Sequence, residues 1–183
     1  MKDYHIVRSS RKTIAIQITP AGQVLVSCPR RMPRKQVEAF VESKRGWIEG
    51  HLSRMGPAPL PLTAEERKQL ICKAALIIPE RAAYFAPLVG VDYGRITIRS
   101  QRTRWGSCSA KGNLNFNCLL VLAPPEVLDY VVVHELCHRK YMNHSEAFWA
   151  EVAKILPDYR LHRLWLKEKG GALMARVAGT CNA

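Results

Sequence analysis

Hydrophobic and polar positions alternate near the start of the chain and later change to a helical spacing. The alternating run at 13–18 and the short stretches at 4–7 and 24–26, with a Pro-Ala-Gly turn signal before the last, predict strands and a hairpin. Apolar side chains then recur three or four residues apart over 33–55, after a proline suited to a first helical turn. The opening third of the chain is therefore expected to be a small sheet with one helix.

A Gly-Pro-Ala-Pro-Leu-Pro segment at 56–61 is the clearest linker signal in the chain. We expect it to separate an N-terminal hairpin-and-helix subdomain, 1–55, from a second domain, 62–183. That domain begins with a capping box, Thr63 and Glu66, and a helix toward residue 89 that two internal prolines are expected to kink or interrupt.

The second domain then alternates between strand and helix patterns. Strands are predicted at 95–99 and 113–119, with a turn-rich segment at 103–110 between them. Helices are predicted over 126–140, from a Ser145 cap to about 157, and over 158–169. This order indicates an α+β fold.

The string His134-Glu135-Leu136-Cys137-His138 lies on the most apolar of these helices. Residues four apart share one face of a helix, so His134 and His138 can bind one metal ion, and Glu135 can reach a metal-bound water. Two unpaired histidines and a glutamate would be costly to bury on an apolar helix, and a metal removes that cost.

A catalytic zinc site needs a third protein ligand. His144 follows six residues after His138 and directly precedes the cap Ser145, where the chain can turn back across the first helix. Glu146 is the competing ligand. His144 is the favoured prediction, with Glu135 as general base and Zn²⁺ as the metal.

These residues resemble the YgjP-like metallopeptidase family. The resemblance covers roughly residues 4–166 and rests on the helix motif and on two flanking strings, Thr103-Arg104-Trp105-Gly106-Ser107-Cys108-Ser109 and Asn143-His144-Ser145-x-x-Phe148-Trp149. The family is similar to the SprT and WLM zincin-type proteases, in which a His before a helix with a Phe supplies the third ligand. It implies a zincin-like metallopeptidase domain with a mixed sheet and an active-site helix, preceded by a strand-rich and helical extension.

Substrate-binding residues are sought close to this helix. Arg102 and Arg104 could hold an anionic group, and Tyr141 could assist an oxyanion. In proteases of this general fold a strand beside the active-site helix binds the peptide, and the candidate is 113–119 with Asn115 on its polar face. A simple amphipathic strand explains the same pattern.

The chain carries 28 Lys+Arg against 15 Asp+Glu, a formal charge of +13, and residues 93–125 contain no acid. Such a field attracts polyanions, so nucleic acid or a nucleotide is a partner to consider beside a polypeptide substrate. Three functions remain open: a zinc peptidase, favoured here and acting on proteins associated with nucleic acid; a nucleoside triphosphate or phosphoanhydride hydrolase using the same site; and a nucleic-acid-binding module with a structural metal.

No stretch reaches the length of a membrane span, and no export signal is recognised at the start. Six scattered cysteines without a Cys-x-x-Cys pair are read as reduced thiols. The expected compartment is the cytoplasm.

Overall fold

The computed structural model describes residues 4–19, 22–55 and 60–178. The chain divides into two compact units, Met1–Leu60 and Pro61–Ala183. No helix in the described ranges combines the length and the apolar composition that a membrane crossing requires. The cysteines within these ranges are free thiols.

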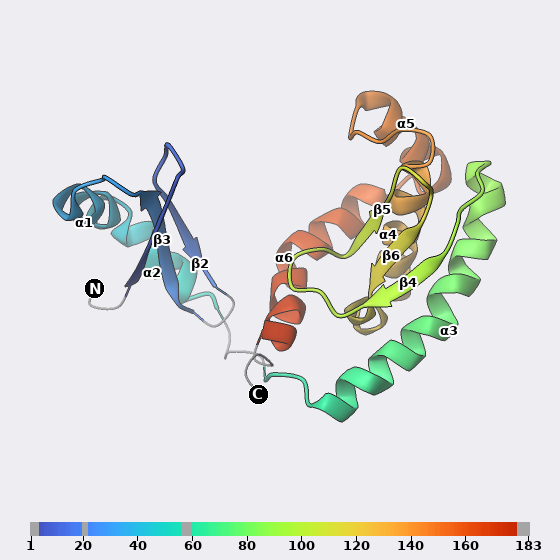
Figure 1. Cartoon of the computed structure of the whole chain (residues 1–183), viewed down its shortest axis with the longest axis horizontal. Helices are drawn as coiled ribbons and strands as arrows, with labels where there is room; N and C mark the ends of the chain where they lie inside the picture. The colour runs from blue at the N-terminus through green and yellow to red at the C-terminus, as the bar shows by residue number, and fades with distance from the viewer. Residues whose placement is uncertain (1–3, 20–21, 56–59, 179–183) are drawn as a thin grey trace. The chain divides into compact units, whose positions relative to one another are not determined.

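The first unit is a three-stranded sheet with two helices on one of its faces (Figure 1). Its strands are β1 (Tyr4–Ser9), β2 (Ala15–Ile18) and β3 (Val24–Pro29), in the order β1-β3-β2, with β1 parallel and β2 antiparallel to β3. The core gathers the inward side chains of β3 with three helix residues; it comprises Val24, Val26, Cys28, Val37, Val41 and Ile48.

The helix expected over 33–55 is two helices, α1 (Arg34–Ser43) and α2 (Arg45–Leu52), so the single-helix prediction was wrong. The chain leaves the helical conformation at Lys44, where φ is −109° and ψ is 7°. Ser43 donates its hydroxyl to the carbonyl of Phe40, and such local side-chain bonds compete with the helical backbone bonds.

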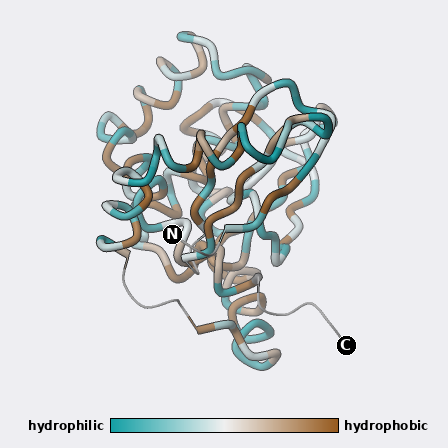
Figure 2. The backbone as a smooth tube through the Cα atoms, turned by 90° about the vertical axis from the view of Figure 1, so that its left-hand side faces the viewer, coloured by the Kyte–Doolittle hydropathy of each residue, from teal (hydrophilic) through white to brown (hydrophobic). Residues whose placement is uncertain are grey.

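The second unit opens on α3 (Ala64–Val89), whose capping box between Thr63 and Glu66 is formed. The prolines were expected to kink or interrupt the helix; it is not interrupted at Pro79 or Pro87, and it ends at Gly90 in the left-handed conformation. Its buried side chains belong to the main core together with those of α4 (Pro125–Cys137), and this packing outweighs the local cost of proline. Figure 2 shows the helical turns alternating between hydrophobic and hydrophilic stretches, as expected for helices with one buried face.

A second three-stranded sheet lies against these helices (Figure 1). Its strands are β4 (Ile96–Arg99), β5 (Gly106–Cys108) and β6 (Leu114–Asn117), in the order β4-β6-β5, with β6 parallel to β4 and antiparallel to β5. A 3-10 helix, η1 (Cys118–Leu122), leads to α4, and α5 (Glu146–Ile155) and α6 (Tyr159–Ala178) complete the unit. The α+β class, the mixed sheets and the motif-bearing helix agree with the sequence-based expectation.

Candidate metal centre

The motif histidines occupy the last turn and the end of α4. The helix ends at Cys137, His138 is its C-cap residue, and the backbone N–H of His138 bonds to the carbonyl of His134 at 3.3 Å. The helix is buried on nearly every side, so the motif is fixed in a rigid element. One helical turn separates the two imidazoles and brings them onto the same face.

His144 is brought to these two rings by a short turn and by the cap of α5. The Ser145 hydroxyl accepts a hydrogen bond from the N–H of Phe148, as predicted for a helix start. The turn is tied to α5 by an ion pair between Lys140 Nζ and Glu151 Oε1, 2.7 Å apart. Glu151 is 7% exposed and also contacts Lys154, and hydrogen bonds from these lysines lower the pKa of its carboxyl.

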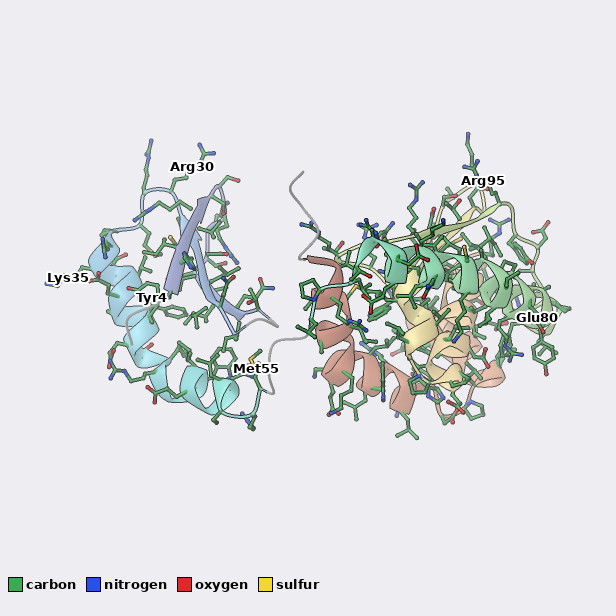
Figure 3. The ribbon with its side chains drawn as sticks, turned by 90° about the horizontal axis from the view of Figure 1, so that it is seen from below. Tyr4, Arg30, Lys35, Met55, Glu80 and Arg95 are labelled. Atoms are coloured by element: carbon green, nitrogen blue, oxygen red, sulfur yellow. The ribbon has the colours of Figure 1, made fainter. Side chains whose placement is uncertain are left out.

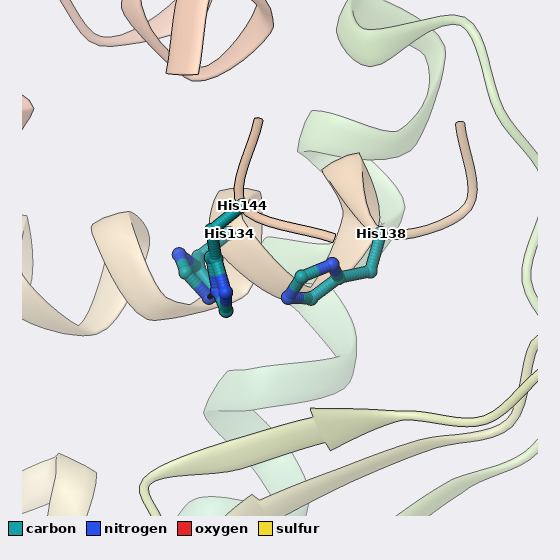
Figure 4. A group of neighbouring side chains, drawn as sticks. All are labelled: His134, His138 and His144. Atoms are coloured by element: carbon teal, nitrogen blue, oxygen red, sulfur yellow. Dashed lines mark hydrogen bonds between the residues drawn. The ribbon is translucent and has the colours of Figure 1, made fainter. Parts of the chain in front are cut away.

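The three imidazoles converge, as Figure 4 shows. One nitrogen from each of His134, His138 and His144 lies within 4.8 Å of the others. His134 Nε2 and His144 Nε2 are 3.0 Å apart. Two lone pairs repel one another at this distance, whereas a proton or a cation held between them draws both nitrogens inward.

Tautomer and burial suit these side chains to a zinc ion. His138 Nδ1 lies 2.9 Å from the carbonyl oxygen of Tyr141, so Nδ1 holds the proton and Nε2 presents its lone pair. The Nδ1 atom of His134 is buried with no hydrogen-bond partner in the structure. His144 is exposed, which leaves one side of the group accessible. Three imidazole nitrogen donors with an open side fit a catalytic zinc site.

Burial also controls the protonation of the centre. Desolvation, with smaller contributions from His138 and His144, lowers the pKa of His134 to about 3. Desolvation likewise lowers the pKa of His144. These histidines are therefore neutral at pH 7, the form that binds a metal.

Glu135 is 5% exposed and lies against the backbone of β5. A methyl group added at Gly106 would be 2.6 Å from Glu135 Oε1 and 2.8 Å from its carboxyl carbon. Burial raises the pKa of Glu135 to about 8, and the positive charge of Arg104 opposes that shift. Glycine is needed at position 106 because any side chain there would displace the carboxylate.

The strand beside Glu135 has a free edge. The backbone N–H of Asn117 donates to the carbonyl of Trp105 at 2.8 Å, and that of Ser109 donates to the carbonyl of Asn113 at 2.9 Å. In an antiparallel pair of strands, residues that bond to the neighbouring strand alternate with residues that do not. The N–H and C=O groups of Gly106 and Cys108 then point away from β6. β5 is an edge strand, so no other strand of the described residues pairs with these groups.

The strand expected to bind the substrate, 113–119, was the wrong one. β6 is the central strand and pairs with β4 on one side and β5 on the other, so neither edge can accept a peptide. Asn115 donates its side-chain amide to the Ser107 hydroxyl at 3.3 Å. The segment expected to be turn-rich, 103–110, contains the edge strand β5 instead.

A pocket of about 230 Å³ adjoins the centre. The lining residues come from α4, from the start of β5 with the two residues before it, and from α6. They are Arg104, Trp105, Gly106, Tyr130, Val131, His134, Glu135 and Leu166. The wall is mainly apolar, and its one cationic lining residue is Arg104. The pocket is open to both Glu135 and His134.

The family model of the "YgjP-like, metallopeptidase domain" matches residues 12–71 and 62–169. The chain belongs to the YgjP-like metallopeptidase family. It is therefore a metal-dependent hydrolase of the peptidase class, as the sequence predicted.

Two solved structures are also similar to this family member. The metallopeptidase zymogen of Pyrococcus abyssi abylysin is 23% identical, with a TM-score of 0.45, over 50% of this chain and 94% of that one. The zymogen of Methanocaldococcus jannaschii jannalysin is 22% identical, with a TM-score of 0.45, over 50% of this chain and 95% of that one. No curated protein matches.

The other sequence-predicted site residues of this YgjP-like chain are separated by the fold. Arg104 lines the pocket, whereas Arg102 is exposed and is not part of the lining. Tyr141 packs beside the main core and contributes its backbone carbonyl to His138. Glu146 and Cys137 are outside the group of converging donors.

Sequence reasoning missed three supports of the centre. Phe148 is fully buried, and its ring centroid lies 4.5 Å from that of His138 and 4.9 Å from those of His134 and His144. Gly106 and Phe148 stand in the strings that carry the family resemblance, but no structural role was predicted for them, and Glu151 was not singled out. Their contacts with Glu135, the imidazoles and the His144 turn are non-local, so the sequence alone did not reveal these roles.

Proposed function

We propose that this chain hydrolyses peptide bonds in extended polypeptide segments, with a zinc ion held by His134, His138 and His144 and with Glu135 as general base. The observation that supports the proposal is the convergence of three imidazoles beside a buried carboxylate. When bound, zinc would supply a Lewis acid that polarises the carbonyl and acidifies a water molecule.

Glu135 performs the proton transfers. Its carboxylate accepts a proton from the attacking water while the water oxygen bonds to the peptide carbonyl carbon. The C–N bond then breaks, and Glu135 returns the proton to the leaving nitrogen. A nearby divalent cation favours the ionised carboxylate and so offsets the effect of burial on the pKa of Glu135.

The free edge of β5 binds the polypeptide backbone. Gly106 and Cys108 offer their N–H and C=O groups, so an extended segment can add to the sheet beside Glu135. Backbone pairing of this kind selects extended chains and carries little preference for side chains. Folded proteins would therefore be cleaved at exposed or unfolded segments.

The pocket beside His134 receives one substrate side chain. Trp105, Val131 and Leu166 contribute apolar walls, so an apolar side chain fits better than a charged one. A nucleoside triphosphate carries several negative charges, and the single arginine of this lining does not match them. The lining therefore favours the peptide over the phosphoanhydride substrate.

A two-substrate assay with metal control tests the proposal. The full chain is stripped with a chelator, reloaded with zinc, and offered unfolded casein in one reaction and nucleoside triphosphates in another, with Glu135→Gln as the blank. We expect zinc-dependent casein cleavage that the blank lacks. Phosphate or diphosphate release that disappears in the blank, with casein left intact, would overturn the peptidase assignment.

A further inference from the structure

Charge in the N-terminal unit is strongly segregated. Residues 4–37 contain seven basic side chains and no acidic one. The seven fall in two short segments, 8–12 and 30–35, and we refer to them as the sheet-end cluster: Arg8, Arg11, Lys12, Arg30, Arg31, Arg34 and Lys35. The acids of the described unit all lie later, on α1 and α2.

The fold brings the two segments together. β1 and β3 are parallel and in register, with Ser9 opposite Pro29, so both segments leave the sheet at the same end. Arg8 Nη1 donates to the carbonyls of Arg30 and Met32, at 2.9 and 2.7 Å. The N–H of Arg30 in turn bonds to the carbonyl of Ser9. Seven cations are therefore concentrated at one end of a small sheet.

Several of these cations are available to an external anion. Arg34 pairs with Glu38, and Arg8 is engaged by carbonyls, but Lys12, Arg30, Arg31 and Lys35 are exposed and form no ion pair among the described residues. Figure 3 shows Arg30 and Lys35 projecting outward from the N-terminal unit. The first turn of α1 carries no acid, so the helix dipole adds to the positive field.

The character of the cluster indicates which polyanion it fits. Five of its seven members are arginines, whose planar guanidinium groups bind phosphate oxygens in pairs. The two segments present no exposed large apolar side chain for insertion into a lipid surface and no aromatic ring for stacking on an unpaired base. A regular phosphate backbone satisfies the cluster better than a membrane or a single strand does.

We infer that the sheet-end cluster binds the phosphate backbone of a nucleic-acid duplex without reading its base sequence. The surface lies outside the metal centre and its pocket. If the proposed peptidase function also holds, such binding would direct cleavage to polypeptides held on nucleic acid.

Fluorescence anisotropy with a labelled duplex of random sequence, on the full chain at several salt concentrations, tests this inference. The triple variant Arg30→Ala, Arg31→Ala, Lys35→Ala removes three charges of the cluster. Lys68→Ala, Lys167→Ala, Lys169→Ala removes three exposed charges from α3 and α6 as a matched control. We expect the cluster variant to bind the duplex at least tenfold more weakly than the unmodified chain does. The plot of log affinity against log salt concentration should also be less steep for this variant, by about 3 in slope.

The control should retain both the affinity and the slope of the unmodified chain. Equal loss in the two variants would mean that net charge alone drives association, and the absence of duplex binding at low salt would also overturn the inference. So would cluster-dependent binding to anionic vesicles without binding to the duplex. Casein turnover, measured in parallel, should be unchanged in both variants; its absence from the unmodified chain would contradict the peptidase proposal while leaving the duplex result intact.

Discussion

In the larger unit the buried polar side chains are Asn117, Glu135, His138 and Glu151, whereas no buried polar side chain is found in the described part of the N-terminal unit. The N-terminal unit instead places its cations on the surface, at one end of its sheet. Desolvated groups held by packing have shifted pKa values and fixed directions, which catalysis requires. Exposed charges act over longer distances, which suits association. Under the two proposals made above, one chain would use burial for chemistry and exposure for binding.

Removal of a metal ligand should produce the largest effect. His138→Ala takes away one of three converging nitrogens, so we expect loss of stoichiometric zinc after dialysis and loss of casein cleavage. His162→Ala is the matched control, because His162 belongs to the same unit but lies on α6, where it pairs with Asp158 just before the helix. Zinc content measured by atomic absorption decides the matter, and a His138→Ala protein that keeps one zinc would contradict the site.

The contact between β5 and Glu135 can be broken with a single methyl group. Gly106→Ala would force the carboxylate aside, so we expect casein turnover to fall at least tenfold and unfolding stability to fall by about 1–3 kcal/mol. Gly171→Ala meets nothing within 4 Å and lies inside α6, so it should raise stability by about 0.5–1 kcal/mol. Urea unfolding and turnover are measured together; equal behaviour of the two variants would rule out the proposed contact.

The buried carboxylate of Glu151 offers a finer test of positioning. Glu151→Gln keeps the shape but removes the charge that binds Lys140 and Lys154, so the turn that carries His144 should loosen. We expect zinc affinity to fall about 10- to 100-fold, as for other groups that orient metal ligands. Competition with a zinc chelator measures the affinity. The exposed Glu168→Gln on α6 serves as control and should bind zinc as the unmodified chain does.

The pocket should affect selectivity more than rate. Leu166→Ala enlarges the pocket, and we expect preference at one substrate position to move toward larger apolar side chains by about tenfold. Leu164→Ala, at a residue 48% exposed on the same helix, should leave the preference unchanged. Cleavage products of a peptide library give the readout. An unaltered preference in Leu166→Ala would show that the pocket does not contact substrate.

Local features of the molecule were predictable from sequence. The motif helix, the Ser145 cap and the capping box at Thr63 each depend on residues a few positions apart, and each is formed. The role of His144 as third ligand remains a prediction, although its ring lies where the prediction requires.

Features that depend on distant pairing were not predictable. β5 is three residues long and reads as a turn, and its strand character comes only from pairing with β6. The alternating pattern of β6 cannot distinguish a central strand from an edge strand, so its lack of a free edge was not predictable. Likewise, α3 continues through its prolines because of packing against the core.

The coordination of zinc in the full chain tests the central claim most directly. X-ray absorption at the zinc edge should give three imidazole nitrogens and one water oxygen at about 2.0–2.1 Å, with no sulfur. His144→Ala should reduce the imidazole count to two. A sulfur neighbour at about 2.3 Å, which would implicate Cys137, or an imidazole count unchanged by His144→Ala would contradict a catalytic centre built from His134, His138 and His144.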